Sequence, residues 1–327
     1  MENTKTTIHL ALDPGYGNCK LWGPDGSTIM PSLVATDGHG EIHDSAMTNR
    51  RPPLDIAIQN HEFYVGKGAH GWGRPVESLD FDRFVGSPEM QALLYGALTL
   101  ASFGNGETID MVVGLPLALL SGDPSNVRKT IRGVKHFFSG DHIWASGDKD
   151  LAVSVSSVSV ASQAVGSLFD YLLTDDGHMT PSRRAQHEQE IGICNIGFNT
   201  VDLLVAQKGA ISQRFTANDT RGVRRFLQLS DRDGLYSLGE LDEQFRARSL
   251  QDDQALDVWK TEVMGFIEDA WGSLFRRFVV VYCVGGGADI LKDALQNRFG
   301  TKFAIADDPI SATARGLYKF MMMKDGR

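Results

Sequence analysis

The 327-residue chain is poor in cysteine: it has three, and they lie far apart in the sequence. Cys19, Cys194 and Cys283 show no CxxC spacing and have no clustered histidines beside them, which argues against both disulfide bonds and a zinc site. We expect them to be small, buried, apolar residues. Long apolar runs are also missing, and none approaches the roughly 20 residues that a membrane-crossing helix requires. We therefore expect a cytoplasmic protein with no membrane span.

Positive charge is scarce as well. The formal net charge is −9, and the 32 lysines and arginines form no basic run that could bind a phosphate backbone. Direct binding to nucleic acid is therefore not expected, and a DNA partner would need an adaptor protein. The length exceeds what one hydrophobic core usually supports, which favours two domains with a cleft between them.

Three short segments combine an apolar strand with a small or glycine-rich turn: LDPGYGNCKLW at 12–22, EIGICNIGFNTVDLLV at 190–205 and VVYCVGGGADIL at 280–291. Such turns bring backbone N–H groups close to phosphate oxygens. Three of them in this order resemble the phosphate-1, phosphate-2 and adenosine motifs of the actin, Hsp70 and sugar-kinase superfamily. The resemblance implies an α/β fold with two actin-like (ribonuclease H-like) domains around a central nucleotide cleft.

The order of the expected elements agrees with that resemblance, because each half opens with a three-strand meander and then alternates helices with strands. In the second half we expect the third strand at 209–216 and helices at 220–229, 237–250 and 252–277. The implied domains are 1–160, which includes a small inserted subdomain at 32–86, then 161–307, and finally a C-terminal helix at 308–327 that returns to the first domain.

The first segment has the residues of a phosphate loop. Gly15 and Gly17 permit a tight turn and a close approach of the backbone to a polyphosphate. Asp13 at the end of the strand could hold a Mg²⁺-bound water, and Lys20 could reach a β-phosphate oxygen as a point charge. The resemblance implies nucleotide contacts from Gly15, Tyr16, Gly17, Asn18 and Lys20, with Asp13 as a catalytic and metal-binding residue. Taken alone, the same residues also fit an ordinary hairpin with a glycine turn and a surface lysine.

The second segment resembles the phosphate-2 loop, and the implied nucleotide contacts are Gly197, Phe198, Asn199, Thr200 and Asp202. It departs from the family's pattern at Asn195, where the family usually has an aspartate that helps to order metal-bound water. Asn195 keeps the shape and can accept a hydrogen bond, but it brings no charge. We assign it a catalytic position, and leave open whether the amide slows hydrolysis or abolishes it.

The segment SQAVGSLFDYLL at 162–173 resembles the actin connecting helix, whose Gln or Glu orients the attacking water, and Gln163 is the matching position. We assign Gln163 to catalysis on that resemblance, because a Gln in the first turn of a helix is unremarkable in itself. In the third segment, consecutive glycines would let the chain lie flat against a base and ribose, with a helix that begins near Asp289. The implied contacts are Gly285, Gly286, Gly287 and Asp289, together with Gly222 at the start of another helix.

The modest length, the small insert and Asp202 resemble the bacterial plasmid-segregation actins of the ParM type and their archaeal relatives. The resemblance implies a slow ATPase that binds ATP, or GTP, with Mg²⁺, polymerises with copies of itself, and segregates plasmids or other DNA through a DNA-bound adaptor. Two alternatives remain: a small-molecule or sugar kinase of the same fold, and a scaffold that binds nucleotide without hydrolysing it. A kinase would need an aspartate base facing an acceptor hydroxyl, and the sequence offers no convincing candidate.

Overall fold

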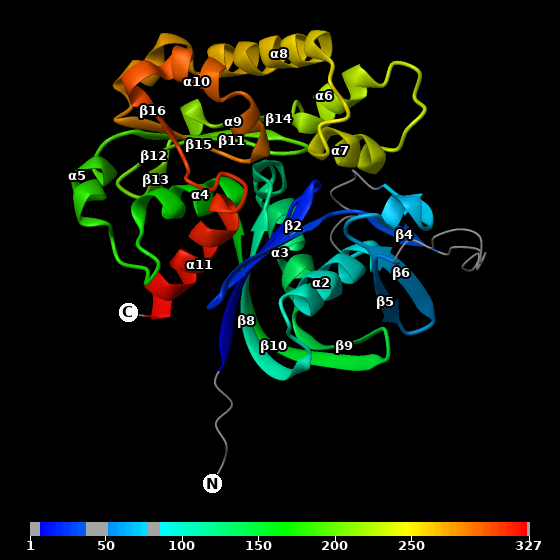
Figure 1. Ribbon diagram of the computed structural model, residues 1–327. Coiled ribbons are helices and arrows are strands. Elements are labelled where there is room, and N and C mark those ends of the chain that lie inside the picture. The colour runs from blue at the N-terminus through cyan, green and yellow to red at the C-terminus, as the bar shows by residue number, and fades with distance from the viewer. Residues whose placement is uncertain (1–6, 37–51, 78–85, 326–327) are drawn as a thin grey trace.

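The computed structural model describes residues 7–36, 52–77 and 86–325. Its two halves, each built on one sheet, lie one above the other in Figure 1. Two helices, α4 (Gln163–Leu172) and α11 (Ala312–Asp325), lie between the sheets on one side of the molecule. This is the two-domain α/β architecture that the three segments predict.

The lower sheet in Figure 1 extends from the first meander. β1 (Ile8–Pro14) pairs antiparallel with β2 (Asn18–Gly23) and parallel with β8 (Asn105–Leu115). Ten described strands follow one another in the order β3 (Gly26–Pro31), β2, β1, β8, β10 (Lys149–Ser162), β9 (Gly140–Ser146), β5 (Leu54–Ile58), β6 (His61–Val65), β4 (Val34–Thr36) and β7 (Arg74–Val76). Within the expected insert, β5 and β6 form an antiparallel hairpin, and 37–51 and 78–85 lie outside the described residues.

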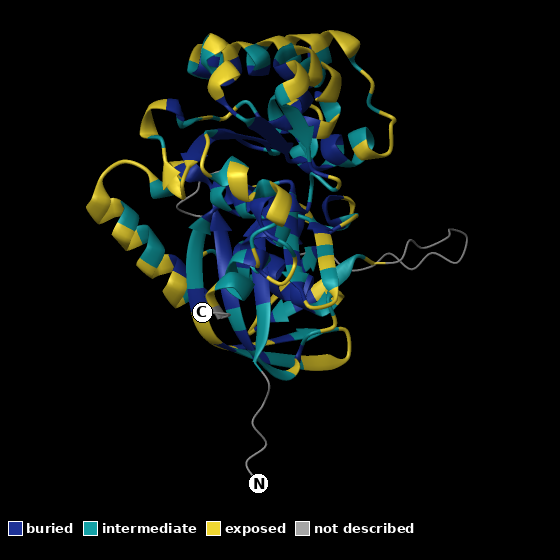
Figure 2. Ribbon diagram, turned by 90° about the vertical axis from the view of Figure 1, so that its left-hand side faces the viewer, coloured by how far each residue is buried: buried dark blue, intermediate teal, exposed yellow. Residues whose placement is uncertain are grey.

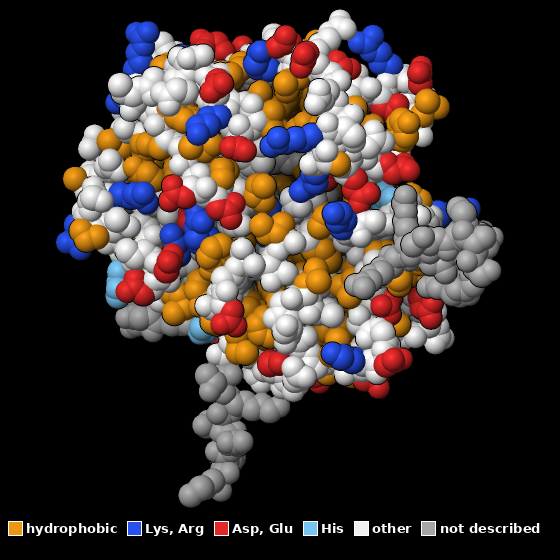
Figure 3. Space-filling model, viewed as in Figure 1, with side chains coloured by type: hydrophobic (Ala, Val, Ile, Leu, Met, Phe, Trp, Pro, Cys, Tyr) orange, Lys and Arg blue, Asp and Glu red, His pale blue; other side chains and the backbone are white. Residues whose placement is uncertain are grey.

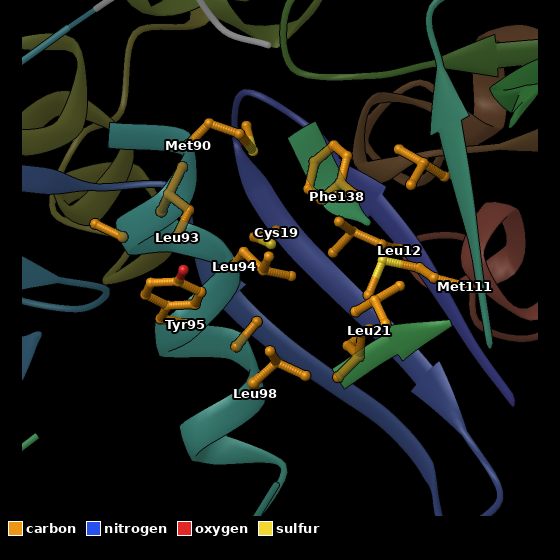
Figure 4. Close-up of a cluster of buried hydrophobic side chains, with 14 of the residues drawn as sticks. Leu12, Cys19, Leu21, Met90, Leu93, Leu94, Tyr95, Leu98, Met111 and Phe138 are labelled. Atoms are coloured by element: carbon orange, nitrogen blue, oxygen red, sulfur yellow. The ribbon is translucent and has the colours of Figure 1, made fainter. Parts of the chain in front are cut away.

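One face of the lower sheet is covered by α2 (Pro88–Leu100). Ser87 caps this helix by accepting a hydrogen bond from the backbone N–H of Met90, and Pro88 occupies the first turn, where its missing N–H costs nothing. The apolar side of α2 packs on the meander and forms the core of this half. Figure 4 shows Met90, Leu93, Leu94, Tyr95 and Leu98 of the helix beside Leu12, Cys19 and Leu21 of β1 and β2.

The upper sheet repeats the opening of the lower one. β11 (Ile191–Ile196) pairs antiparallel with β12 (Val201–Gln207) and parallel with β15 (Val280–Val284). These strands are buried almost throughout, as Figure 2 shows, because helices cover both faces of the sheet. The order of the described strands is β13 (Ala210–Ile211), β12, β11, β15 and β16 (Phe303–Ile305), and β14 (Ala217–Asp219) also pairs with β12.

The remaining elements of the second half differ in detail from the sequence-based expectations. The third strand expected at 209–216 forms only as β13, which is two residues long and pairs with β12, and the chain then takes a 3-10 turn at Gln213–Phe215 before β14. The expected long helix ends early, since Gly272 takes a φ of +47°. The helix expected to begin near Asp289 in the third segment starts earlier, at Gly286. Gly286 and Gly287 therefore belong to this helix. The helices are α6 (Val223–Ser230), α7 (Leu238–Arg246), α8 (Asp253–Trp271), α9 (Gly286–Ile290) and α10 (Lys292–Phe299).

Helices α4 and α11 pack closely against each other. A Cβ at Gly316 would clash with the carbonyl oxygen of Gly166, so glycine is required where the two helices cross. Beside the crossing, the buried Asp170 carboxylate accepts two hydrogen bonds from Arg315, at 2.6 and 2.7 Å, and one from Tyr282 Oη at 2.8 Å. These bonds fasten α4 to both α11 and β15. Helix α4 is thereby held between the two sheets (Figure 1).

Candidate functional site

The three segments meet at one cavity of about 200 Å³ between the two halves. Most of the residues assigned to the site from the sequence line this cavity. They are Asp13, Gly15, Tyr16, Gly17, Asn18, Lys20, Gln163, Asn195, Gly197, Phe198, Asn199, Thr200, Gly285 and Gly286, whereas Asp202, Gly222, Gly287 and Asp289 do not line it. Tertiary folding therefore brings together groups from both halves of the chain.

The turn between β1 and β2 is organised by Asp13. Asp13 and Lys20 lie directly opposite each other in the β1–β2 ladder, so their side chains are on the same face. Lys20 Nζ donates to Asp13 Oδ2 at 2.7 Å, and Gln163 Nε2 donates to Asp13 Oδ1 at 2.8 Å. The Asp13 residue is only 1 % exposed, and each of its oxygens is paired. One carboxylate thus holds both the ammonium group and the glutamine amide at the cavity wall.

The turn between β11 and β12 touches the first turn. A Cβ at Gly17 would come within 2.7 Å of Phe198 Cβ, so the two loops can approach this closely only because residue 17 is glycine. The second turn is closed by a hydrogen bond of 2.8 Å from the Gly197 N–H to the carbonyl oxygen of Thr200. The two turns therefore meet at one part of the cavity wall.

Gly222 supports the second turn from behind. A Cβ at Gly222 would clash with the carbonyl oxygen of Phe198. In the first turn of α6, the N–H of Val223 donates to Gly197 O at 3.0 Å and the N–H of Arg224 donates to Phe198 O at 2.7 Å. These N–H groups are used by the protein itself. Gly222 itself does not line the cavity. Its contribution is to hold the β11–β12 turn in position.

Asn195 and Asp202 lie opposite each other near the end of the β11–β12 ladder. Asn195 lines the cavity, and Asp202 is buried behind the wall. Thr200 Oγ1 donates to Asp202 Oδ2 at 3.2 Å, whereas Asp202 Oδ1 has no hydrogen-bond partner among the described residues. Burial raises the pKa of the Asp202 carboxyl to about 7, against the lowering effect of the Thr200 bond. The second turn therefore contains a carboxyl group whose charge the protein does not balance.

The glycines of the third segment have three different roles. Gly285 has a φ of +89°, and a Cβ there would clash with the carbonyl oxygen of Ile196, so the chain can turn here only with glycine. Gly286 lines the cavity, and a Cβ on it would meet no atom closer than 3.9 Å. Gly287 packs on β11, where a Cβ would clash with the Ile196 side chain, and Asp289 is exposed to solvent. Of the three glycines, only Gly285 and Gly286 line the cavity.

Helix α7 supplies part of the wall that sequence analysis missed. Asp242, Phe245 and Arg246 line the cavity, and Arg246 Nε donates to Asp242 Oδ2 at 2.7 Å. Burial raises the pKa of Asp242, against the lowering effect of Arg246. The i, i+3, i+4 spacing shows that the three share a helix face, but nothing local shows that this face meets the glycine turns. The other cavity residues not expected from the sequence are Pro116, Val223, Ile290, Ile310 and Thr313.

A second set of contacts joins the two halves beside α7, on the opposite side of the molecule from α4 and α11 (Figure 1). These contacts connect the small insert of the first half with the start of α7. The Gly68 N–H donates to Glu243 Oε1 at 2.6 Å, the Gly239 N–H donates to Glu77 Oε1 at 3.2 Å, and His70 Nδ1 lies 3.1 Å from Ser237 Oγ. The cavity is therefore enclosed between two bridges that connect the sheets.

The side chains at the cavity suit a metal that arrives with phosphates. Within the described ranges, no group of three or more His, Cys, Asp or Glu side chains could hold a metal ion. Mg²⁺ does not need such a cage, because it keeps several waters and usually binds through one or two carboxylates and substrate phosphates. The side-chain oxygens of Asp13 and Asn195 at the cavity wall are hard ligands of the required kind, whereas the Asp202 carboxyl is buried behind that wall. The unpaired oxygen of Asp202 is consistent with a cation in this region.

Comparisons with known proteins agree with the geometry. Residues 11–166 match the family model for the N-terminal domain of actin-like proteins. Similar solved structures include apo ParM of pSK41 (TM-score 0.72, 16 % identity, 98 % of each chain covered). A 15-stranded ParM filament from Clostridium botulinum has a TM-score of 0.70 and 20 % identity, with 96 % of this chain and 99 % of that chain covered. The archaeal actin homologue Ta0583 in complex with ADP has a TM-score of 0.71 and 16 % identity, covering 98 % of this chain and all (100 %) of that chain. No curated protein matches the sequence.

The chain therefore has the actin-like fold, and its first half matches the model of the actin-like N-terminal domain. Within that class it has the fold of the ParM-type proteins, as the three segments indicated. In the part of the chain that the structure describes, no helix is long and apolar enough to span a bilayer.

Proposed function

We propose that this chain binds ATP, or GTP, together with Mg²⁺ in the cavity and polymerises with copies of itself in the nucleotide-bound state. The observation that carries the proposal is the hydrogen-bonded series Lys20–Asp13–Gln163 beneath two glycine turns that touch each other. An ADP complex and a filament among the similar structures support the two parts of the proposal.

Each wall of the cavity has a distinct task in this proposal. Backbone N–H groups within 16–18 and 198–200 hold the phosphates, because those of Gly15 and Gly197 already donate to Asp13 O and Thr200 O, and Lys20 adds a positive charge. Gly285, Gly286 and the α7 face hold the nucleoside. Bound Mg²⁺ would neutralise phosphate charge, and the protein oxygens available to hold it, directly or through water, are those of Asp13, Asn195 and Asp202.

Hydrolysis in this proposal depends on Gln163. Its amide nitrogen is occupied by Asp13, which leaves the carbonyl oxygen to accept a hydrogen bond from a water. Orienting that water toward the terminal phosphate is the main contribution a side chain can make to phosphoryl hydrolysis. Asn195, where the family usually has aspartate, brings no charge to the same region, so we expect slow turnover.

The biological role that we propose is segregation of plasmids or other DNA in the cytoplasm, through a DNA-bound adaptor protein. The domain limits that we propose are 1–160 with the insert at 32–86, then 161–307, and 308–327. The start of α4 at Gln163 and of α11 at Ala312 support these limits, because both helices lie between the two sheets.

A kinase of the same fold is the less suitable alternative. Such an enzyme needs a carboxylate that can accept the proton of an acceptor hydroxyl. Among the described residues that line the cavity, the carboxylates are Asp13, which is bonded to Lys20 and Gln163, and Asp242, which is bonded to Arg246. Neither is free to act as that base.

Sedimentation combined with phosphate release tests the proposal. The native chain should pellet with ATP or GTP and Mg²⁺, remain in solution without nucleotide, and release phosphate slowly. Gln163→Ala should still bind nucleotide and pellet, but should release phosphate about a hundredfold more slowly and disassemble later. Failure to pellet under any nucleotide condition would overturn polymerisation. Pelleting without phosphate release would instead identify the non-hydrolysing scaffold.

A further inference from the structure

The loop at 231–236, between α6 and α7, presents two apolar side chains to solvent. Leu235 is 73 % exposed and Tyr236 is 50 % exposed. The loop lies at the upper right of Figure 1, where hydrophobic side chains protrude in Figure 3. Asp231 holds it in shape, because its carboxylate accepts hydrogen bonds from the backbone N–H groups of Leu235 and Tyr236 at 3.2 and 3.1 Å. A loop that is already ordered loses little conformational entropy when it binds a partner.

Acidic groups flank this exposed loop. Arg232 Nη2 donates to Gln254 Oε1 at 2.8 Å, which fastens the loop to the first turn of α8. Asp233 in the loop and Asp253 in that turn are both exposed. The surface is therefore an apolar pair beside two carboxylates.

A complementary surface lies on the other half of the molecule, along α3 (Pro124–Phe138). This helix has four lysines and arginines and no acidic residue, and only Val134 and Phe138 are buried. A groove of about 1000 Å³ runs beside it. The groove is lined by the apolar Ala118, Leu119, Val127 and Phe137, and also by Lys129. Arg132 is exposed one helical turn from Lys129, so a second positive charge lies on α3 close to the groove.

We propose that the exposed loop of one copy docks in the groove beside α3 of a second copy. Leu235 and Tyr236 would cover the apolar wall, and Asp233 and Asp253 would face Lys129 and Arg132. A nucleic acid fits this groove less well, because apolar side chains make up part of its wall and the chain has a net charge of −9. The two surfaces lie on different halves, so the contact is head-to-tail, and such contacts build open filaments unless the rotation closes a ring. The inference rests on the proposed polymerisation and names its contact.

Cysteine cross-linking tests the contact directly. The three native cysteines are buried, so introduced thiols will be the reactive ones. Gly133 lines the groove, and a Cβ there meets no atom within 4 Å. The double variant Gly133→Cys, Leu235→Cys should form a ladder of disulfide-linked oligomers when it is oxidised after nucleotide-induced assembly. The matched control is Gly265→Cys with Leu235→Cys, because Gly265 is an equally open glycine on α8, away from the groove. The control should give at least about tenfold less ladder.

Substitutions on the loop supply an independent measurement. Leu235→Ser with Tyr236→Ser should raise the critical concentration about tenfold or more without a change in nucleotide affinity. Ile143→Ser, at an apolar side chain of β9 that is 70 % exposed, should leave the critical concentration unchanged. Lys129→Glu should weaken assembly, because it places two acidic groups opposite each other. The double variant Lys129→Glu, Asp233→Lys reverses the pair and should restore assembly. Assembly of the native chain without a ladder and without these effects would overturn this contact but not the proposed function. Absence of any native assembly would overturn both.

Discussion

The two turns that meet at the cavity are built on equivalent hairpins, but they balance their charges differently. In the first, Lys20 lies opposite Asp13, and both oxygens of the carboxylate are hydrogen-bonded. In the second, Asp202 lies opposite Asn195, and one carboxyl oxygen of Asp202 has no partner among the described residues. A buried carboxyl without a partner is costly when it is charged. The first turn is therefore organised by the protein alone, whereas the second requires a proton or a cation for its charge to be balanced.

The strongest test removes the nucleotide that, in our proposal, both turns bind. Gly286→Val places a branched side chain on the cavity wall, at a position with room for a Cβ in the protein itself. We expect nucleotide affinity to fall about a hundredfold or more, measured by titration with a fluorescent nucleotide, and the thermal unfolding midpoint to change little. Gly265→Val on α8 is the matched control. Unchanged affinity in the Gly286 variant would contradict the assignment of this wall.

A second test breaks the paired turn. Lys20→Ala removes the cation that faces Asp13 and the phosphates, so affinity for ATP and ADP should fall about tenfold to a hundredfold more than affinity for adenosine. The variant should also lose stability, because Asp13 keeps only its bond to Gln163. Adding Asp13→Asn should recover that stability without recovering phosphate affinity. Calorimetric titration with the three ligands checks this, and equal losses for all three would favour an ordinary hairpin.

A third test concerns the unpaired turn and pH. The pKa of Asp202 is about 7 in the folded protein against its ordinary value of 3.8, so the folded state binds a proton more tightly than the unfolded state. Stability from this group is complete below pH 3.8 and is lost as the pH rises to about 7. Asp202→Asn removes the penalty, so its stability gain over the native chain should grow by roughly 2 kcal/mol between pH 5 and pH 8.

Urea unfolding without nucleotide at the two pH values measures this difference. Asp233→Asn, on the exposed loop, serves as the control and should show no such growth. Parallel pH curves for native and Asp202→Asn protein would mean that the Asp202 carboxyl is already balanced, and would remove the contrast between the two turns.

The smallest expected effect comes from Asn195→Asp. The new carboxylate lies opposite Asp202, so the protein without ligand should become less stable above pH 7. With Mg²⁺ and ATP bound, a charged ligand holds a hard cation better than an amide, so hydrolysis should rise a few-fold, roughly threefold to tenfold, with affinity retained. Phosphate release and ATP affinity are measured together. Weaker affinity with no gain in rate would mean that Asn195 is only a packed turn residue.

The turns themselves were predictable because their chemistry is local. Gly17 and Gly285 occupy positions where a Cβ would collide, and each follows a strand that the apolar pattern marks. The Lys20–Asp13 pair could also be anticipated, since a short turn places these residues opposite each other. The strand expected at 209–216 was too long, because only Ala210–Ile211 pair with β12 and Gln213–Phe215 form a 3-10 turn.

The sequence by itself determined the order of the strands and turns, the glycines on which they depend, and the identity of the groups available to a nucleotide. Only the tertiary structure decided which of those groups reach the cavity. It placed Asp202 behind the wall, used the first N–H groups of α6 to hold the second turn, and added the α7 face with Asp242 and Arg246. The physical reason is that burial and hydrogen-bond pairing depend on contacts between residues distant in the chain, whereas turn geometry depends on neighbours.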